Sequence, residues 1–269
     1  MNYGLTLPIF DEMAHPAVLA ELATEAEQAG WDGVFVWDHV YYRPPATAVT
    51  DPWIALAAMA AATDSITLGP MVTPLARRRP QVVARQIVAL DQLSEGRMVL
   101  GVGLGLDSSG GEFIRFGEET DVTVRAEHYD EALAVLGALL TGQRVDHDGP
   151  HYRVSDAQFL PRPYRGRLPV WTAVRWPNRR PLARGVQNDG VFAVDLGVED
   201  VPELRAYLEE RRPQGLDQFE IVVQGPPGSD PAPWAAAGAT WWLATFDPFT
   251  VNPSVVRRAI GQLPAGAFG

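Results

Sequence analysis

The residues with the clearest capacity for chemistry are an adjacent aspartate and histidine, Asp38 and His39. They follow directly after residues 33–37, an apolar run with the length and composition of a buried strand. A carboxylate accepts hydrogen bonds from hydroxyl or cationic groups, and histidine is the side chain that ordinarily titrates near neutral pH. The pair therefore predicts a site of general acid–base chemistry, with a structural or solvent-exposed histidine as the alternative.

A run of three arginines, Arg77, Arg78 and Arg79, stands just before Pro80, where a helix is expected to begin. Three guanidinium groups in sequence could bind an anion. They could equally form a solvated rim ahead of the helix. The pattern leaves both interpretations open.

Three closely spaced glycines, Gly101, Gly103 and Gly105, would let a flat ring or a sugar chain lie close to the backbone. The run also suggests a dinucleotide-binding fingerprint, but the third glycine of that fingerprint would fall at Ser108. No acidic residue stands at a convincing distance downstream. We therefore reject a Rossmann site.

Composition excludes several classes of function. The chain has no cysteine, which rules out disulfides, thiolate nucleophiles and iron–sulfur clusters, and its 22 basic residues are all arginine, which rules out Schiff-base chemistry. A net charge of −11 argues against nucleic acid and anionic membranes as partners. No apolar run approaches a membrane span, and residues 1–10 resemble a strand more than a signal peptide, so a cytoplasmic location is expected.

Short β-rich runs alternate with longer segments of helical spacing, as they do in repeated βα units. Eight runs are predicted as strands: residues 3–9, 33–37, 66–72, 97–102, 169–174, 190–194, 219–224 and 240–246. This count favours an α/β fold of the TIM (β/α)8 barrel type, as one domain over residues 1–269, with a doubly wound sheet as the alternative. Pro16 and the pair Asp51–Pro52 have the residue types that begin helices, and Gly30 the type that ends one.

The longest interval between predicted strands runs from residue 103 to residue 168 and contains a helix near residues 123–140. A hairpin is predicted after it, with strands at residues 144–147 and 151–154 around the turn Asp148–Gly149. The hairpin contains two histidines and two aspartates, but their spacing fits no common set of metal ligands. A turn explains them better, and no metal site is predicted.

Active sites of TIM barrels form at the carboxyl ends of the strands. This rule selects Asp38 and His39 after the second predicted strand, the loop at Gly105 after the fourth, and Arg175 with Trp176 after the fifth.

The residues also resemble a known family, the luciferase-like, flavin-dependent oxidoreductases. The resemblance rests on Gly30-Trp-Asp-Gly-Val-Phe-Val-Trp-Asp-His39, Asp51-Pro-Trp-Ile-Ala-Leu-Ala-Ala58, Leu90-Asp-Gln-Leu-Ser-Glu-Gly-Arg97, Leu100-Gly-Val-Gly103, Asn188-Asp-Gly190 and Ala237-Gly-Ala-Thr-Trp241. These segments occur in the family's order and extend over nearly the whole chain.

The resemblance implies a TIM barrel, commonly dimeric, that uses reduced FMN or the deazaflavin coenzyme F-420. The Asp–His pair is more typical of the deazaflavin branch, where the aspartate contacts the cofactor and the histidine gives or takes a proton, roles that pass to Asp38 and His39. Further contacts with the cofactor map to Met71, Val72 and Thr73 on the third strand and to Leu104, Gly105 and Ser109 after the fourth. A cis peptide or a bulge is implied near Met71–Val72.

One position departs from the family. Many members hold the cofactor phosphate with two glycines after the fifth strand, where this chain has Arg175 and Trp176. Arg175 could replace the lost backbone donors with a guanidinium, and Trp176 could instead block the site.

Three functions remain open from the sequence. The main hypothesis is hydride transfer between F-420 and a small organic substrate. The alternatives are a monooxygenase that uses reduced FMN and a barrel that binds a flavin or a metabolite without turnover. A homodimer is expected through helices of the first half, which include the alanine-rich residues 55–62.

Overall fold

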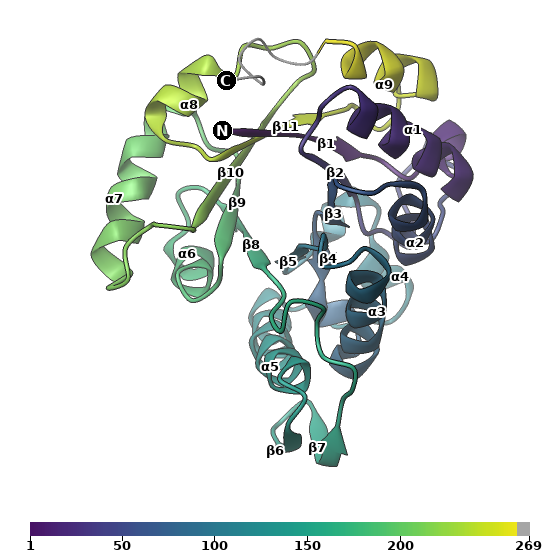
Figure 1. Ribbon diagram of the computed structural model, residues 1–269. Coiled ribbons are helices and arrows are strands. Elements are labelled where there is room, and N and C mark those ends of the chain that lie inside the picture. The colour runs from purple at the N-terminus through teal and green to yellow at the C-terminus, as the bar shows by residue number, and fades with distance from the viewer. Residues whose placement is uncertain (263–269) are drawn as a thin grey trace.

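The computed structural model describes residues 1–262, and its central feature is a ring of parallel strands with helices around the outside (Figure 1). The order of strands in the sheet is β3 (Thr67–Pro70), β2 (Gly33–Val36), β1 (Asn2–Leu7), β11 (Trp241–Thr245), β10 (Glu220–Gly225), β9 (Gly190–Val194), β8 (Val170–Arg175), β5 (Leu100–Gly103) and β4 (Thr73–Pro74).

The two ends of this order meet, so the sheet is closed. Leu68 on β3 forms a parallel bridge with Met98, and the amide of Val99 donates a hydrogen bond of 2.9 Å to the carbonyl of Leu68. The strand β4, which follows β3 in the chain, pairs with β5. The fold is therefore the predicted barrel and not a doubly wound sheet.

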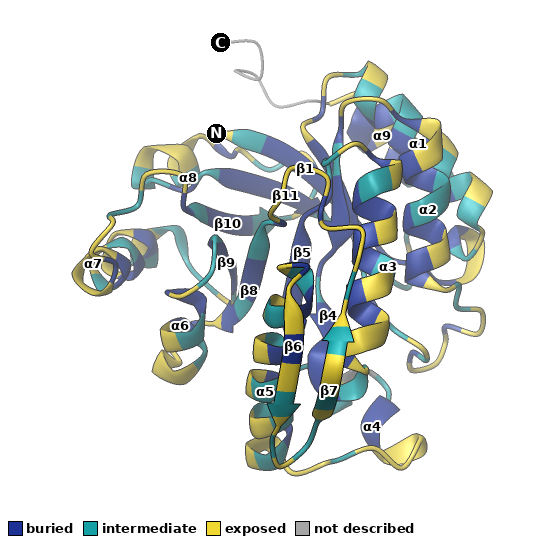
Figure 2. Ribbon diagram, turned by 60° about the horizontal axis from the view of Figure 1, so that its bottom comes forward, coloured by how far each residue is buried: buried dark blue, intermediate teal, exposed yellow. Residues whose placement is uncertain are grey.

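The helices lie on the outside of the ring, with their buried faces toward the strands (Figure 2). They are α1 (Pro16–Gln28), α2 (Pro52–Ala62), α3 (Pro80–Leu93), α4 (Glu112–Arg115), α5 (Val122–Leu140), α6 (Arg179–Gly185), α7 (Val201–Arg211), α8 (Ala232–Ala237) and α9 (Pro253–Ile260). Asp51 caps α2 as predicted, because its carboxylate accepts hydrogen bonds from the amides of Trp53 and Ile54, both at 2.9 Å.

A hairpin is present after α5 as predicted, and it lies beside that helix (Figure 2). Its turn was predicted wrongly: Asp148 belongs to β6 (Arg144–Asp148) and pairs with Arg153 of β7 (Arg153–Gln158), so residues 149–152 form the turn, and the φ of Gly149 is not positive. A wider loop thus replaces the tight Asp148–Gly149 turn in this hairpin. One of its histidines, His147, bonds the carboxylate of Glu131 on α5 at 2.7 Å, and the same carboxylate accepts the amide of Tyr152. These contacts dock the hairpin on the helix. Within residues 1–262, no cluster of three or more possible metal ligands is found.

The structure differs from the sequence analysis in one strand and in one helix. The third strand, predicted as one run, is divided into β3 and β4 by Met71–Val72, whose peptide bond is cis. This confirms the prediction of a cis peptide or bulge at that place. The sequence also gave no sign of the short helix α4, which is too short to show helical periodicity.

Aromatic side chains fill the barrel interior near the amino ends of the strands. The ring centroids of Phe35 and Trp171 are 5.6 Å apart, and those of Trp171 and Trp241 are 5.3 Å apart. All three side chains are buried. These rings close the barrel interior toward the amino ends of the strands in the described part of the chain.

No helix in the described range 1–262 combines the length and the apolar character needed to span a bilayer. The predicted domain of residues 1–269 extends over residues 263–269, which lie outside the described residues.

Arg97 ties α2 to the start of β3, which makes it a test of the fold. Its guanidinium donates hydrogen bonds to the carbonyls of Ala60, Thr63, Ile66 and Ser94 and to the Thr63 hydroxyl, at 2.7 to 3.0 Å. We expect Arg97→Ala to lower the free energy of unfolding by about 3 kcal/mol, because it leaves several buried carbonyls unpaired. Urea denaturation measures the change.

The matched control is Arg258→Ala, which removes an exposed arginine from the last turn of α9. This substitution is expected to change the free energy of unfolding by no more than about 0.5 kcal/mol. Equal effects of the two substitutions would contradict the role given to Arg97.

Candidate active site

A cavity of about 830 Å³ opens at the carboxyl ends of the strands. It brings together most residues that the sequence predicted for the site: Asp38, His39, Met71, Val72, Leu104, Gly105 and Arg175 all line it. Thr73 and Trp176 do not line the cavity. The side chain of Ser109 lies outside the described part of the structure, so its predicted contact stays a prediction.

His39 is held by a glutamate from another part of the chain. Its Nδ1 lies 2.8 Å from Oε2 of Glu112, at the start of α4. A carboxylate accepts a hydrogen bond, so Nδ1 carries the proton and Nε2 is the ring nitrogen left for other partners. The described residues provide no hydrogen-bond partner for Nε2.

Glu112 also fixes the backbone around the histidine. Its Oε1 accepts hydrogen bonds from the amides of Val40 (2.6 Å) and Tyr41 (3.1 Å) and from Nη1 of Arg77 (2.8 Å). Burial acts to raise the pKa of Glu112, but the bond with His39, the charges of His39 and Arg77, and the amide of Val40 together lower it. Glu112 is therefore a buried, ionised carboxylate that orients the imidazole of His39.

Aromatic rings surround the imidazole on its other sides. The ring centroid of His39 lies 5.1 Å from that of Tyr42, 5.7 Å from Phe10 and 6.1 Å from Trp37. Phe10 and Tyr42 are themselves stacked at 4.3 Å. The ring is thus confined, and 18% of its side-chain surface stays exposed.

Asp38 lies at the same end of the barrel, but its carboxylate is occupied by protein donors. Oδ2 accepts the Thr73 hydroxyl at 2.9 Å, and Oδ1 accepts Arg78 at 2.6 Å and Arg77 at 3.3 Å. The Asp38 side chain is fully buried. The predicted contact of Asp38 with a cofactor stays a prediction, and the structure shows that this carboxylate also neutralises the arginines.

Arg77 and Arg78 therefore have neither role that the sequence suggested for the arginine run, whereas Arg79 is exposed, as expected of a solvated rim. Side-chain exposure is 5% for Arg77 and 17% for Arg78, so they form no solvated rim. Their anionic partners are internal, the carboxylates of Asp38 and Glu112. Two buried negative charges and two positive charges compensate one another.

Two glycines allow the strands to approach the cavity closely. A Cβ on Gly103 would lie 2.7 Å from a methyl group of Val72. Gly105 has a φ of +77°, and a Cβ there would lie 2.9 Å from both Phe113 and Pro74. These contacts give a packing reason for the glycines at the end of β5 and directly after it.

The opposite wall of the cavity carries positive charge. Arg175, Arg179, Arg180 and Arg184 line it, and all four come from the end of β8 or from α6. Arg175 is half exposed and pairs with Asp195 at 2.7 Å. Trp176 is buried in the core instead, under the guanidinium of Arg179 at 5.0 Å, so it does not block the cavity.

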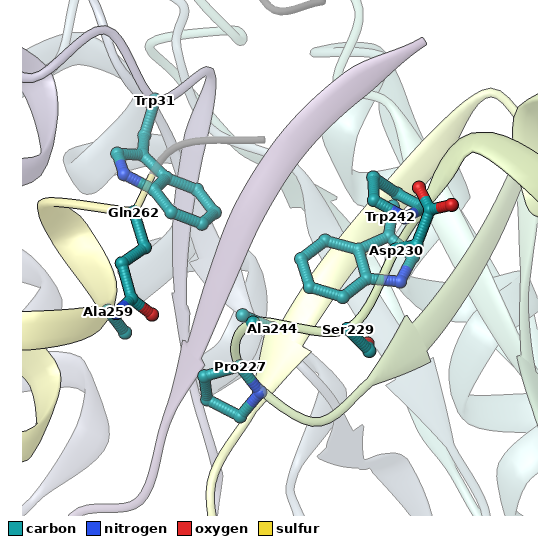
Figure 3. A pocket seen from close by; sticks show the side chains of 10 residues that line it. Trp31, Pro227, Ser229, Asp230, Trp242, Ala244, Ala259 and Gln262 are labelled. Carbon is teal, nitrogen blue, oxygen red and sulfur yellow. The ribbon is translucent and has the colours of Figure 1, made fainter. Parts of the chain in front are cut away.

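A second cavity of about 490 Å³ lies away from these residues. Figure 3 shows Trp31, Ala259 and Gln262 on one side of the purple strand β1, and Trp242, Ser229 and Asp230 on the other. It contains neither the Asp–His pair nor an arginine, so the larger cavity is the candidate active site.

Sequence reasoning missed Glu112, the main partner of His39. The one available signal was an acidic residue next to Phe113, in an otherwise polar loop after the predicted fourth strand. That signal does not identify a partner 73 residues away in the chain.

Comparison with known proteins assigns the family. The model of the family described as "Luciferase-like monooxygenase" matches residues 1–252. This chain belongs to that family. The match extends over both walls of the cavity, including the Asp–His pair and the arginines of α6.

The relatives of the chain include several proteins named for F420. An "F420-dependent glucose-6-phosphate dehydrogenase" of Beutenbergia cavernae is 37% identical over 241 residues, which cover 85% of this chain and 69% of that protein. An "F420-dependent hydroxymycolic acid dehydrogenase" of Mycobacterium tuberculosis is 28% identical, over 97% of this chain and 73% of that protein. Of a further relative, from Microbacterium testaceum, the chain covers 51%.

Solved structures share the fold over the whole chain. An "F420-dependent secondary alcohol dehydrogenase in complex with an F420-acetone adduct" aligns with a TM-score of 0.82, covering 100% of this chain and 99% of the other at 17% identity. The F420-dependent tetrahydromethanopterin reductase of Methanopyrus kandleri aligns with a TM-score of 0.78 and 98% coverage of both chains. At these identities the likeness establishes the barrel alone.

The lowered pKa of Glu112 predicts a pH dependence of stability. Its ordinary value is 4.5, and the folded protein holds it lower, so the unfolded chain binds more protons as the pH falls through this range. The stability that the ionised Glu112 adds to the folded protein is fully present above about pH 5. It is lost as the pH falls through the lower pKa that Glu112 has in the folded protein. Thermal melts of wild type and Glu112→Gln between pH 3 and pH 7 measure it.

We expect Glu112→Gln to cost about 3 kcal/mol at neutral pH, because it leaves Arg77 with less compensation, and to show a shallower loss of stability in acid. Glu118→Gln, at an exposed position in the segment before α5, is the control and should follow the wild type. Parallel pH profiles for wild type and Glu112→Gln would contradict the prediction.

Proposed function

We propose that this protein is an oxidoreductase that transfers hydride between coenzyme F-420 and a small organic substrate. The observation that carries the proposal is the pair of His39 and Glu112, which leaves one imidazole nitrogen without a hydrogen-bond partner among the described residues, at the wall of a ligand-sized cavity. The names of the relatives support the choice of coenzyme.

The residues of the cavity fit a flat, anionic cofactor. Met71, Val72, Ala173 and Phe192 provide apolar surface on neighbouring strands, and the volume of about 830 Å³ is typical of sites for ligands of this size. A deazaflavin supplies hydride transfer when it is bound. The apolar residues would hold its ring system.

The arginines at the end of β8 and on α6 would hold the anionic part of the cofactor. Arg184 is already engaged in a two-point pair with Asp130, and Arg179 pairs with Glu203 at 2.6 Å. Arg175 pairs with the half-exposed Asp195, so solvent weakens that pair. We assign the binding of the cofactor phosphate to Arg175. Its guanidinium is the best available replacement for the backbone donors of the two glycines that many family members have at this place.

His39 would perform the proton chemistry. Glu112 holds Nδ1, so Nε2 gives or takes the proton that accompanies hydride transfer. The aromatic rings of Phe10, Trp37 and Tyr42 pack near the imidazole and limit its movement. Asp38 would act mainly by holding Arg77 and Arg78 in place beside the site.

We also propose the organisation of the protein as one luciferase-like barrel domain over residues 1–269 and as a cytoplasmic homodimer. The proposed dimer surface contains Ile54 on α2 and Val82 on α3, with exposures of 61% and 49%. Apolar side chains exposed on neighbouring helices support an interface there.

Affinity for the two flavins tests the proposal against its alternatives. Fluorescence titration should show tighter binding of F-420 than of reduced FMN. Tight binding of FMN with oxygen uptake would favour a monooxygenase, and binding of F-420 without turnover of any alcohol or ketone would favour a binding protein.

One prediction from the proposed function concerns His39. We expect His39→Asn to lower kcat by at least about tenfold, because general acid–base groups contribute about 10² to 10⁴ to rate, with little change in F-420 affinity. Steady-state kinetics measure the effect. His15→Asn is the matched control, since asparagine also caps a helix and His15 is exposed at the start of α1.

If His39 serves packing alone, His39→Asn will lower the melting temperature and leave the activity of the folded protein unchanged. Asp38→Ala should show the opposite pattern to the His39 prediction. It leaves Arg78 without a counter-charge and Arg77 with Glu112 alone, so F-420 affinity and stability should fall together.

Another prediction from the proposed function concerns Arg175. We expect Arg175→Ala to weaken F-420 binding about tenfold through the loss of a charge-assisted contact. Arg167→Ala, which breaks another exposed ion pair, with Asp189, outside the cavity, is the control and should bind F-420 like the wild type. Unchanged affinity of Arg175→Ala would refute the assignment.

A further prediction concerns the proposed dimer. Light scattering at micromolar concentration should give twice the mass of the chain, and Ile54→Glu should shift it toward the monomer. Ile114→Glu, an equally drastic change at an exposed position on α4, should leave the mass unchanged. A monomeric wild type would contradict the proposed interface.

A further inference from the structure

One exposed segment of this acidic protein is strongly basic. Residues 159–167, Phe159-Leu-Pro-Arg-Pro-Tyr-Arg-Gly-Arg167, contain three arginines and no acidic residue, whereas the whole chain has a net charge of −11. The segment comes just before β8, so it lies at the amino ends of the strands, and none of its residues lines the large cavity. Any role of this segment is therefore separate from the candidate active site.

The backbone of the segment is fixed on α3. The amide of Tyr164 donates a hydrogen bond of 2.7 Å to Oδ2 of Asp91. The carbonyl of Arg162 accepts a hydrogen bond of 2.8 Å from Nε2 of Gln92. A backbone that is already held in place loses little conformational entropy when a partner binds to it.

The side chains on the outside of the segment combine positive charge with apolar surface. Arg162 and Arg165 are exposed, Tyr164 between them is 51% exposed, and Leu160 is 56% exposed. Leu160 and Arg162 lie together, because a Cβ on Gly142 would contact the side chains of both. Arginine and tyrosine are enriched among the residues that dominate binding at protein interfaces. We refer to these four residues, Leu160, Arg162, Tyr164 and Arg165, as the Arg–Tyr surface.

The two arginines of the Arg–Tyr surface form no ion pair with a carboxylate of residues 1–262. Arg162 donates to the carbonyl of Gly166 at 3.1 Å, which leaves its charge uncompensated. Arg165 lies against Gly96, where a Cβ would come 2.8 Å from its Nε. Both charges are therefore open to an external anion.

Asp91 is the buried carboxylate beside this surface, but it does not neutralise it. Only 2% of Asp91 is exposed, and its Oδ2 already accepts the amide of Tyr164. Burial raises the pKa of Asp91, and the amides of Tyr164 and Met98 and the charge of Arg165 offset only part of this rise. Asp91 therefore anchors the backbone of the segment.

We propose that the Arg–Tyr surface binds an acidic peptide segment of a protein partner. The guanidinium groups of Arg162 and Arg165 pair with carboxylates of the peptide, and Tyr164 and Leu160 contact its apolar side chains. The net charge of −11 opposes a long polyanion such as nucleic acid, so a short acidic peptide is favoured. Because the surface lies away from the cavity, the partner leaves the cavity open.

Selection from a phage library of random dodecapeptides, with the full chain immobilised, tests the proposal without a known partner. We expect the enriched peptides to contain several acidic residues next to an aromatic residue or leucine. Binding of a fluorescein-labelled copy of the most enriched peptide, measured by anisotropy, should weaken at least about threefold between about 50 mM and about 300 mM sodium chloride. Enriched peptides without an excess of acidic residues would overturn the proposal, as would tighter binding of a single-stranded oligonucleotide.

A pair of charge reversals locates the binding site. Arg162→Glu combined with Arg165→Glu should weaken binding of the peptide at least about tenfold, because two charge-assisted contacts are replaced by repulsion. Arg211→Glu combined with Arg258→Glu makes the same change of charge at exposed positions of α7 and α9, and it should bind the peptide like the wild type. Equal effects of the two double variants would overturn the proposal.

Two further measurements separate binding from folding and from self-association. Tyr164→Ser changes no charge and should weaken binding of the peptide at least about threefold while the thermal melt stays that of the wild type. Light scattering should give the Arg162→Glu, Arg165→Glu variant the same mass as the wild type. A changed mass would assign the Arg–Tyr surface to a contact between copies of this chain and would overturn the proposal, as would unchanged binding by Tyr164→Ser.

Discussion

The active end of the barrel depends on a buried cluster of compensating charges. Asp38 and Glu112 are carboxylates with almost no exposed surface, and Arg77 and Arg78 supply the opposite charges at hydrogen-bonding distance. A buried charge without a partner costs several kcal/mol, so none of the four can be placed without the others. The cluster therefore joins the end of β2, the segment after β4, and α4 into one rigid unit.

This unit assigns different tasks to the two nitrogens of His39: Nδ1 fixes the orientation of the ring, and Nε2 is left for proton transfer. Glu112 uses one oxygen to hold Nδ1 of His39 and the other to bind two backbone amides and Arg77. The orientation of the imidazole is thus set by the protein, and Nε2 is left for chemistry. The aromatic plug of Phe35, Trp171 and Trp241 closes the interior below, so ligands meet the imidazole from one direction.

Membership of the luciferase-like family does not by itself identify a substrate, because barrels keep their strands while their loops vary. The relatives carry names that refer to a sugar phosphate and to a hydroxymycolic acid, two unlike substrates. In this chain, the arginines that line the cavity gather after β8, on the wall across from His39, and the arginines near His39 are neutralised within the protein.

The sequence by itself determined the βα alternation, the helix start at Asp51, the presence of a hairpin after α5 and the placement of His39 at a strand end, because local periodicity and caps report directly on backbone structure. The turn of that hairpin, at residues 149–152, it did not. Only the tertiary structure decided which side chains meet. Glu112 binds His39 across 73 residues, and Trp176 turns into the core while Arg175 faces the cavity. Such contacts depend on how loops pack over the closed barrel, and no local pattern encodes them.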